Sequence, residues 1–257
     1  MERRYASPLL IALAIVAVLA GSVYLYWTIF RGVPELPEPE MPTVSPPREV
    51  PPPPPPQLEL PDLAASDAFV RSLVEGLSSH PRLAAWLVND HLVERFVAVV
   101  DNVARGESPR VHVPFLAPEA GFAVEQEDGH PVIAEESFRR YDLLAAAVAS
   151  LDTDGAVRLY RDLAPLFEEA YAELGNPGSF ELALVAAIDR LLAVEVPEGE
   201  VELSERIDAY AFADARLERL SPAAKHLLRL GPYNAHEVQT KLRTFKTALA
   251  LTRPPGE

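Results

Sequence analysis

The chain has 257 residues, a formal net charge of −15, 26 prolines and no cysteine. The absence of cysteine excludes disulfide scaffolds, cysteine-ligated zinc or iron–sulfur sites and a lipid-modified N-terminal cysteine. The acidic balance argues against sequence-independent binding to nucleic acid, which needs clustered positive charge. We therefore predict no nucleic-acid partner.

An uncharged stretch, residues 8–30, follows a short N-terminal segment, 1–7, that contains Arg3 and Arg4. As a helix it would span roughly 34 Å at about 1.5 Å per residue, enough for the hydrocarbon core of a bilayer. We predict a single transmembrane helix over 8–30, with a cleavable signal peptide as the alternative. The positive-inside rule then places residues 1–7 in the cytoplasm and the main domain in the periplasm of a bacterial inner-membrane protein.

The next segment, 31–61, holds 13 of the 26 prolines, including the unbroken run from Pro51 to Pro56. Proline lacks the backbone N–H and fixes φ, so this segment is expected to form neither helix nor sheet. We predict a polyproline II linker that acts as a stalk. The alternative is a ligand for a proline-recognising groove.

From residue 62 to 257 the apolar period is mostly helical, which predicts a mainly α fold: a compact multi-helix domain with a small β-hairpin or extended insertion. Ser66 is expected to cap the first helix, and Asn89 to cap a strongly apolar one that includes Phe96. Residues 105–134 are rich in proline and glycine, and Asp128-Gly129 between two short apolar runs is a hairpin signal.

The second half continues the helical pattern. One helix is expected from about Glu135, and a longer one over 154–174, capped near Asp152 and kinked or restarted at Pro165. Residues 200–213 are ambiguous, with Tyr210 and Phe212 expected in the core. The chain then predicts a terminal helix pair, whose N-caps are Ser221 and Asn234.

Several of these segments resemble a known family. They are Trp86-Leu87-Val88, Arg95-Phe96-Val97, Val100-Asp101-Asn102, Arg140-Tyr141-Asp142, Leu159-Tyr160-Arg161, Ala170-Tyr171-Ala172-Glu173-Leu174-Gly175, Tyr210-Ala211-Phe212-Ala213-Asp214 and Leu228-Arg229-Leu230-Gly231-Pro232. The chain resembles the bacterial family labelled domain of unknown function 3014 over most of 62–252. The resemblance implies a single-pass membrane protein with a proline-rich segment before the domain, and it implies no activity.

No enzyme motif is present in the sequence: there is no phosphate loop, nucleophile elbow, zinc-protease helix or dinucleotide fingerprint. The six histidines are scattered, without helical metal-ligand spacing. Asp152-Thr153-Asp154-Gly155 begins like a calcium loop, but the twelfth position is Leu163 where the loop needs a glutamate. We predict no metal and no cofactor.

Three polar groups stand out among apolar neighbours. If they converge, they would form a pocket suited to an anionic or sugar-like ligand. If they do not, they are buried ion pairs and helix caps, and a third reading makes Asp101 and Asp142 a general acid–base pair. The candidate ligand-binding residues are Asp101, Asn102, Arg140, Tyr141, Asp142, Tyr160 and Arg161.

Charge is unevenly distributed along the domain. Residues 62–215 contain 11 basic and 29 acidic side chains, whereas 216–253 contain eight basic and two acidic ones. The basic terminal hairpin predicts a surface for an acidic partner or for anionic lipid headgroups, with Lys241, Arg243 and Lys246 as candidate contacts.

These patterns favour a non-catalytic function. We expect the periplasmic helical domain of a membrane-anchored protein to bind or scaffold an envelope protein partner. The alternatives are an enzyme that acts on an envelope polymer or lipid, and a small-ligand-binding module, both using the polar residues near Asp101, Arg140 and Asp142.

Overall fold

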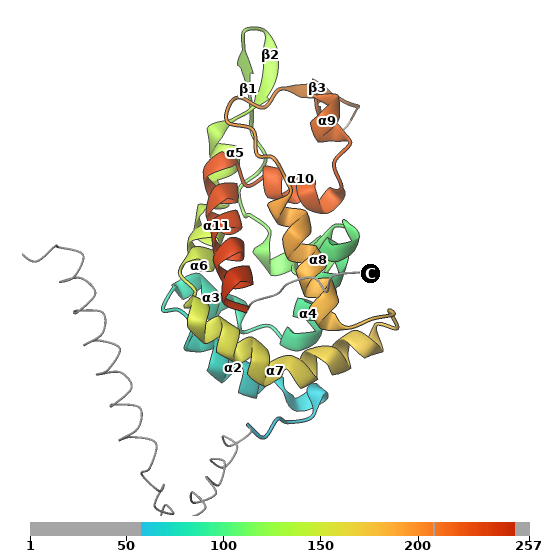
Figure 1. Cartoon of the computed structure of the whole chain (residues 1–257). Coiled ribbons are helices and arrows are strands. Elements are labelled where there is room, and N and C mark those ends of the chain that lie inside the picture. The colour runs from blue at the N-terminus through green and yellow to red at the C-terminus, as the bar shows by residue number, and fades with distance from the viewer. Residues whose placement is uncertain (1–57, 208, 250–257) are drawn as a thin grey trace, which may run out of the picture. The chain divides into compact units, whose positions relative to one another are not determined.

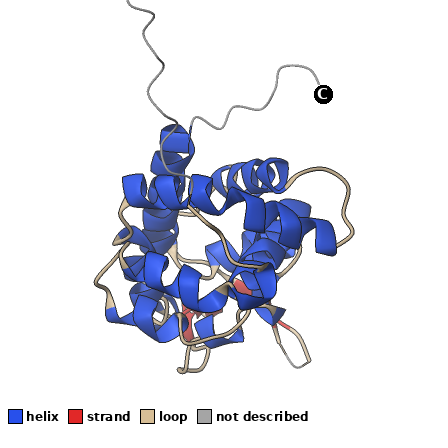
Figure 2. Ribbon diagram, turned by 90° about the horizontal axis from the view of Figure 1, so that it is seen from below, coloured by secondary structure: helices blue, strands red, loops and turns tan. Residues whose placement is uncertain are grey.

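The computed structural model describes residues 58–207 and 209–249. Over these residues the chain is mainly helical, with ten α-helices and two β-hairpins (Figures 1 and 2). The predicted membrane helix (8–30) and the linker up to residue 57 lie outside the described residues. Among the described helices, none is long and apolar enough to cross a membrane.

In chain order the elements are η1 (Leu63–Ala65), α2 (Asp67–Glu75), α3 (Pro81–Trp86), α4 (Leu92–Arg105), η2 (Pro109–Val111), η3 (Pro114–Leu116), β1 (Val124–Glu127), β2 (His130–Ile133), α5 (Glu135–Arg139), α6 (Asp142–Ala149), α7 (Thr153–Glu173), α8 (Phe180–Leu192), β3 (Leu203–Glu205), β4 (Tyr210–Phe212), α9 (Ala215–Glu218), α10 (Pro222–Leu228) and α11 (Pro232–Leu249).

The larger hydrophobic cluster lies between α2, α4, α7 and α8, and α11 packs against its side. In Figure 1, α7 crosses the base of this layer and α11 runs up one flank. The cluster forms because α4 and α8 each bury an apolar stripe, in which Val97 and Phe180 are almost fully enclosed. Phe96, Phe167 and Phe180 stack around one another with ring centroids 5.2–5.8 Å apart, as aromatic cores prefer.

The two hairpins lie together at the other end of the domain (Figure 1). The β1–β2 hairpin turns at Asp128 and Gly129, whose φ values of 49° and 84° are those of a type I′ turn, so the predicted hairpin is confirmed. The β3–β4 hairpin was not predicted. A bridge between Val132 and Glu202 joins the two hairpins, which together cover a second hydrophobic cluster with α10 and α11.

Two predicted side-chain caps near the start of the domain do not form. Ser66 does occupy the N-cap position of α2, as predicted, but it is fully buried in a helical conformation and its hydroxyl makes no cap hydrogen bond. Asn89 donates to the carbonyl of Trp86 at 2.7 Å instead of capping α4. The backbone N–H groups of His91 and Leu92, at the start of α4, donate instead to the carboxylate of Asp67. Asp67 lies 24 residues before His91, so no local sequence pattern reveals this cap.

Three later expectations are also corrected. The helix expected from Glu135 breaks at Arg140 and Tyr141 into α5 and α6. Helix α7 continues through Pro165 as a single element, so it does not restart there. Asn234 lies inside α11 and is buried, because Pro232 already starts that helix.

The other predicted caps are confirmed. Asp152 accepts a hydrogen bond from the backbone N–H of Gly155 at 2.9 Å and caps α7. Ser221 accepts from the N–H of Ala224 and caps α10. Both lie immediately before their helices, within reach of the orphan N–H groups of the first turn.

Candidate functional site: an aromatic and cationic hollow

A surface hollow of about 620 Å³ lies beside the β3–β4 hairpin, over the second hydrophobic cluster. Four parts of the chain line it: the segment before β1, the end of β2, the β3–β4 hairpin, and helices α9 and α10 with the residue after α10. Its apolar rim includes Phe122, Ile207 and Tyr210, and its basic side chains are Arg206, Lys225 and Arg229.

The apolar rim is unusually exposed. Phe122 is 46% exposed, Tyr210 is 43% exposed and Ile207 is 99% exposed. The rings of Phe122 and Tyr210 pair at a centroid distance of 6.1 Å, tilted by 55°. Phe212, two residues further along β4 and therefore on the same face, is buried in the cluster beneath. Contiguous exposed apolar side chains of this kind mark interaction surfaces.

Arg140 fixes the position of Phe122. Its Nη1 donates to the carbonyl of Ala120 at 3.1 Å, two residues before the ring, and its Nε donates to the carbonyl of Ser137 at 2.9 Å. The guanidinium carbon lies 5.7 Å from the centroid of Phe122 and 5.3 Å from that of Tyr141. Arg140 is not among the residues that line the hollow, but its contacts support one of the aromatic side chains that do.

Glu218 joins the edge of β4 to α10. One carboxylate oxygen accepts a hydrogen bond from the N–H of Phe212 at 3.1 Å, and the other accepts from Lys225 Nζ at 2.8 Å. These two bonds, that from Lys225 first, hold the pKa of Glu218 below its usual value. Lys225 is therefore neutralised, whereas the guanidinium groups of Arg206 and Arg229 have no hydrogen bond or ion pair within the described residues.

The first group of predicted ligand-binding residues is occupied in packing. Asp101 is 4% exposed and pairs with Arg105 at 2.9 Å, one turn along α4. Asn102 donates to the carbonyl of Ser108 at 3.1 Å and accepts from Arg105. Asp101 thus pairs within α4, whereas Asn102 ties α4 to the segment that follows it, and neither lines the hollow.

Asp142 has a different structural partner. Its Oδ1 accepts a hydrogen bond at 2.9 Å from Nδ2 of Asn234, which also lies 3.2 and 3.0 Å from the carbonyls of Phe138 and Leu230. Asn234 is 3% exposed, so it satisfies these groups at the buried contact between α11 and the α5–α6 junction. No described hydrogen bond or ion pair connects Asp142 to Asp101.

Tyr160 and Arg161 lie on α7, in the helical layer. The ring of Tyr160 stacks on Phe167 at a centroid distance of 5.9 Å. Burial, and then the nearby carboxylates of Glu181 and Glu168, raise the pKa of Tyr160 to about 12. Arg161 is exposed. The described contacts thus distribute the seven predicted residues over separate places, and among them Arg140 contacts a residue that lines the hollow, Phe122.

The predicted partner-binding lysines of α11 are largely used inside the domain. Lys241 donates to the carbonyl of Leu151 at 2.7 Å, and Lys246 forms an ion pair with Asp189. Arg243 is exposed, and its hydrogen bond within the described residues is to Gln239 on its own helix, at 3.4 Å. Of the three predicted contacts, Lys241 and Lys246 are therefore engaged within the domain, and Arg243 is the exposed one.

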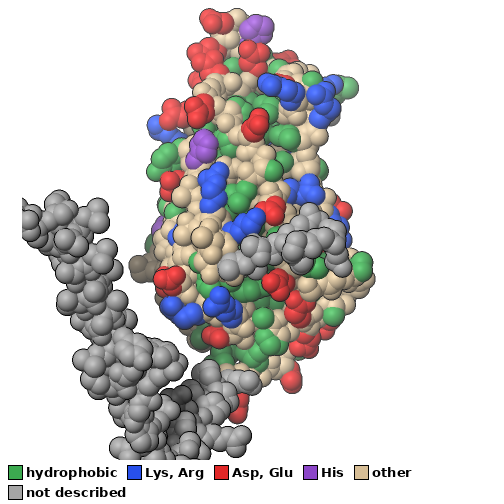
Figure 3. Space-filling model, viewed as in Figure 1, with side chains coloured by type: hydrophobic (Ala, Val, Ile, Leu, Met, Phe, Trp, Pro, Cys, Tyr) green, Lys and Arg blue, Asp and Glu red, His purple; other side chains and the backbone are tan. Residues whose placement is uncertain are grey.

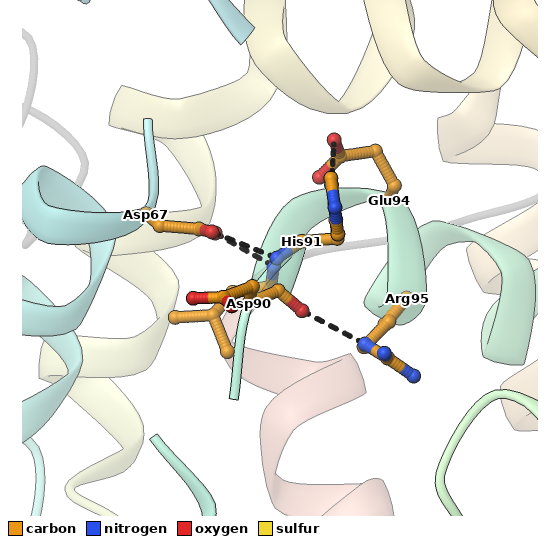
Figure 4. A network of polar contacts seen from close by, with 6 residues as sticks. Asp67, Asp90, His91, Glu94 and Arg95 are labelled. Carbon is orange, nitrogen blue, oxygen red and sulfur yellow. Dashed lines mark hydrogen bonds and ion pairs between the residues drawn. The ribbon is translucent and has the colours of Figure 1, made fainter. Parts of the chain in front are cut away.

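A polar network surrounds the start of α4 (Figure 4). Both carboxylate oxygens of Asp67 accept backbone hydrogen bonds, from His91 at 2.7 Å and from Leu92 at 2.8 Å. The backbone of His91 is left-handed, with φ 61°, and its ring meets Glu94 at 3.2 Å. Arg95 donates to the carbonyl of Asp90 at 2.8 Å. Every bond here holds a turn or a helix start, so the network is structural.

Acidic side chains gather at the end of the molecule formed by the β1–β2 hairpin (Figure 3). Glu127 lies close to Glu200, and their repulsion is the main cause that raises the pKa of Glu127. In the part of the chain that the structure describes, no group of three or more histidine and carboxylate side chains is arranged to hold a metal ion.

A family model described as "Protein of unknown function (DUF3014)" matches residues 92–246. The chain belongs to the DUF3014 family. The matched range includes every residue named above as lining the hollow, whereas the first segment of the expected resemblance, 86–88, lies before it. No curated protein and no solved structure matches the chain. Family membership therefore agrees with the resemblance and assigns no activity.

Sequence reasoning did not identify the hollow. Phe122 lies in a proline- and glycine-rich segment without periodicity, and Ile207 and Tyr210 were part of the ambiguous stretch. Tyr210 was expected in the core, but it is 43% exposed. One signal in the sequence could have indicated the basic side of the hollow: Lys225 and Arg229 are four residues apart, on α10 and at its C-cap.

Proposed function

We propose that this domain recognises a protein partner at the hollow beside β3–β4. The occupant is an acidic segment that also carries apolar side chains. Its apolar groups would cover Phe122, Ile207 and Tyr210, and its carboxylates would pair with Arg206 and Arg229. The observation that carries this proposal is the position of Arg206 and Arg229, whose guanidinium groups form no hydrogen bond or ion pair within the described residues, beside an exposed aromatic pair.

The cellular setting is part of the same proposal. We infer an inner-membrane protein anchored by residues 8–30, with a proline-rich stalk over 31–61 and the helical domain in the periplasm. The support is the length and apolar composition of the uncharged stretch, the preceding arginines and the proline content of the linker. An anchored domain on a stalk is suited to capturing an envelope protein within a limited radius.

Photocrosslinking in cells tests the location of the partner. A photoreactive residue at Tyr210 should give a defined crosslinked product, and so should one at Ile207. The matched control is Leu174, which is also 43% exposed but lies at the end of α7. Products of the same size and yield from Leu174, or no product from either hollow position, would contradict the proposal.

A binding measurement tests the chemistry of the occupant. The full-length protein in detergent should bind a short labelled peptide of alternating leucine and glutamate, and not the corresponding peptide of leucine and lysine. Arg206→Glu should weaken the binding about tenfold or more, because it replaces an attraction by a repulsion. Arg161→Glu, at an exposed position on α7, should leave it unchanged. Equal binding of both peptides would overturn the charge argument.

No specific observation favours the enzymatic alternative. Its candidate acid–base pair is Asp101 and Asp142. Asp101 is paired with Arg105 and Asp142 accepts from Asn234, and neither carboxylate lines the hollow. A general acid and base must reach one substrate together. We therefore propose recognition without catalysis at this site.

A further inference from the structure

The segment after α4 meets α10 through one side-chain contact. Ser108 Oγ lies 2.7 Å from His226 Nε2, although the two residues are 118 positions apart. The contact is held from both sides. The carbonyl of Gly106 accepts from the N–H of Ala223 at 3.2 Å, and Asn102 donates to the carbonyl of Ser108 at 3.1 Å. The relative placement of residues 106–110 and α10 is therefore well determined by hydrogen bonds.

Two arginines flank this contact. Arg110 follows Ser108 by two residues on η2, and Arg229 follows His226 by three residues at the end of α10. Both are exposed, and neither guanidinium has a hydrogen bond or ion pair within the described residues. Burial first, and then the positive charges of Arg229 and Arg110, lower the pKa of His226.

The neighbouring carboxylates do not neutralise this cluster. Glu107, next to Ser108, forms its ion pair with Arg105 at 3.3 Å. Glu218 is bonded to Lys225, the residue before His226. The groups that shift His226 are all cationic. The chain has 38 acidic side chains, yet Glu107 and Glu218 are paired with residues outside this cluster. The two arginines beside a half-buried imidazole therefore repel its protonated form, and a bound anion would offset that repulsion.

We propose that Ser108, Arg110, His226 and Arg229 form a binding site for a phosphoryl group. A phosphoryl group offers several acceptor oxygens and up to two negative charges. Arginine donates to such oxygens through two N–H groups at once. Ser108 and His226 share one hydrogen bond, which uses one of their two hydrogens, so the pair adds one further neutral donor. The group belongs either to free phosphate or to a phospholipid head. The site shares only Arg229 with the hollow, and it does not depend on the proposed peptide recognition.

The imidazole of His226 reports directly on occupancy. The full-length protein in detergent is titrated with inorganic phosphate while the ring resonances of His226 are followed by NMR as a function of pH. A bound anion should raise the pKa of His226, since it offsets the two arginines. Saturable phosphate binding without any change at His226 would overturn the location of the site, and absence of saturable binding would overturn the proposal.

Variants separate the cluster from general surface charge. Arg110→Ala should weaken phosphate binding about tenfold, the usual loss for one charge-assisted pair. Ser108→Ala should weaken it less. Arg82→Ala removes an exposed arginine on α3, far along the chain from the cluster, and should change nothing. Equal weakening by Arg82→Ala would reduce the effect to nonspecific charge and contradict the site.

The source of the phosphoryl group is decided by the same NMR signal. Inorganic phosphate and a water-soluble short-chain phosphatidic acid are compared on wild type and Arg110→Ala. Tighter binding of phosphatidic acid, lost in the variant, identifies a lipid head. Equal or tighter binding of inorganic phosphate identifies a soluble anion. Loss of peptide binding in Arg206→Glu with phosphate binding retained would show that phosphate binding does not depend on peptide recognition at the hollow.

Discussion

The guanidinium carbon of Arg140 lies 5.7 Å from the ring centroid of Phe122, and its Nη1 donates to the carbonyl of Ala120. Arg140 belongs to a polar group that the sequence suggested as a ligand contact. Its contacts instead orient an aromatic side chain that faces the hollow. A charged residue can thus shape a recognition surface without belonging to its exposed face.

Arg140→Ala should therefore affect stability and recognition together. We expect a loss of about 1–2 kcal/mol in the free energy of unfolding, from two charged hydrogen bonds and two cation–π contacts. Peptide binding at the hollow should weaken as Phe122 loses its support. Denaturant unfolding and peptide titration measure the two effects.

The neighbouring arginine is the control for this prediction. Arg139 makes an exposed ion pair with Glu135 at 2.7 Å, one turn away on α5. Exposed pairs contribute at most about 1 kcal/mol. Arg139→Ala should change stability little and leave peptide binding intact. If both variants weaken binding equally, Arg140 acts only through its net charge.

Gly231 lies between α10 and α11, where the chain passes close to Phe138 of α5. Its φ is +80°, and a Cβ at this position would lie 2.5–2.8 Å from atoms of Phe138. Gly231→Ala should cost about 2–4 kcal/mol, the sum of left-handed strain and forced displacement of the ring. Gly175 has φ +72° with open space around it, so Gly175→Ala should cost only the strain, about 1–2 kcal/mol.

Thermal unfolding of the two glycine variants gives the comparison. The difference between them isolates the contact with Phe138, because both positions have similar left-handed φ values. Similar losses for both would mean that the ring moves aside at little cost.

The sequence predicted the features that short-range chemistry determines. Asp128-Gly129 forms the expected hairpin turn, and Asp152 and Ser221 cap the helices that follow them. Each depends on hydrogen bonds or backbone preferences within about four residues. Mainly helical architecture followed from the 3.6-residue apolar period for the same reason.

The features that the sequence did not predict depend on contacts between distant parts of the chain. Asn89 is a good cap residue in the correct place, but Asp67 takes the role because α2 packs against the start of α4. The hollow likewise combines Phe122 with residues more than 80 positions later, such as Tyr210. Periodicity and local spacing carry no information about such encounters.

The long-range cap gives a third prediction. Asp67→Ala removes the acceptor for the N–H groups of His91 and Leu92, and should lower stability by about 1–2 kcal/mol. Asp90→Ala is the control, since the described contact of Asp90 in this network uses its backbone carbonyl. Urea unfolding measures both. Equal loss in the two variants would show that Asp67 acts by charge and not as a cap.

His226 gives a prediction on pH. Its pKa in the folded protein lies below the usual value near 6.5, because of burial and the two arginines, so the unfolded chain takes up this proton at higher pH than the folded one. Stability should therefore fall as the pH decreases through about 6.5, and this contribution should be absent above about 7.5. His226→Gln keeps a donor for Ser108 but cannot titrate, so its unfolding free energy should depend less on pH between about 5 and 7 in phosphate-free buffer.

His130→Gln, exposed at the tip of β2, is the matched control. Adding phosphate should reduce the wild-type dependence, because an anion between Arg110 and Arg229 makes protonation of the imidazole easier in the folded state. A His226→Gln profile identical to wild type would mean that other groups cause the acid sensitivity.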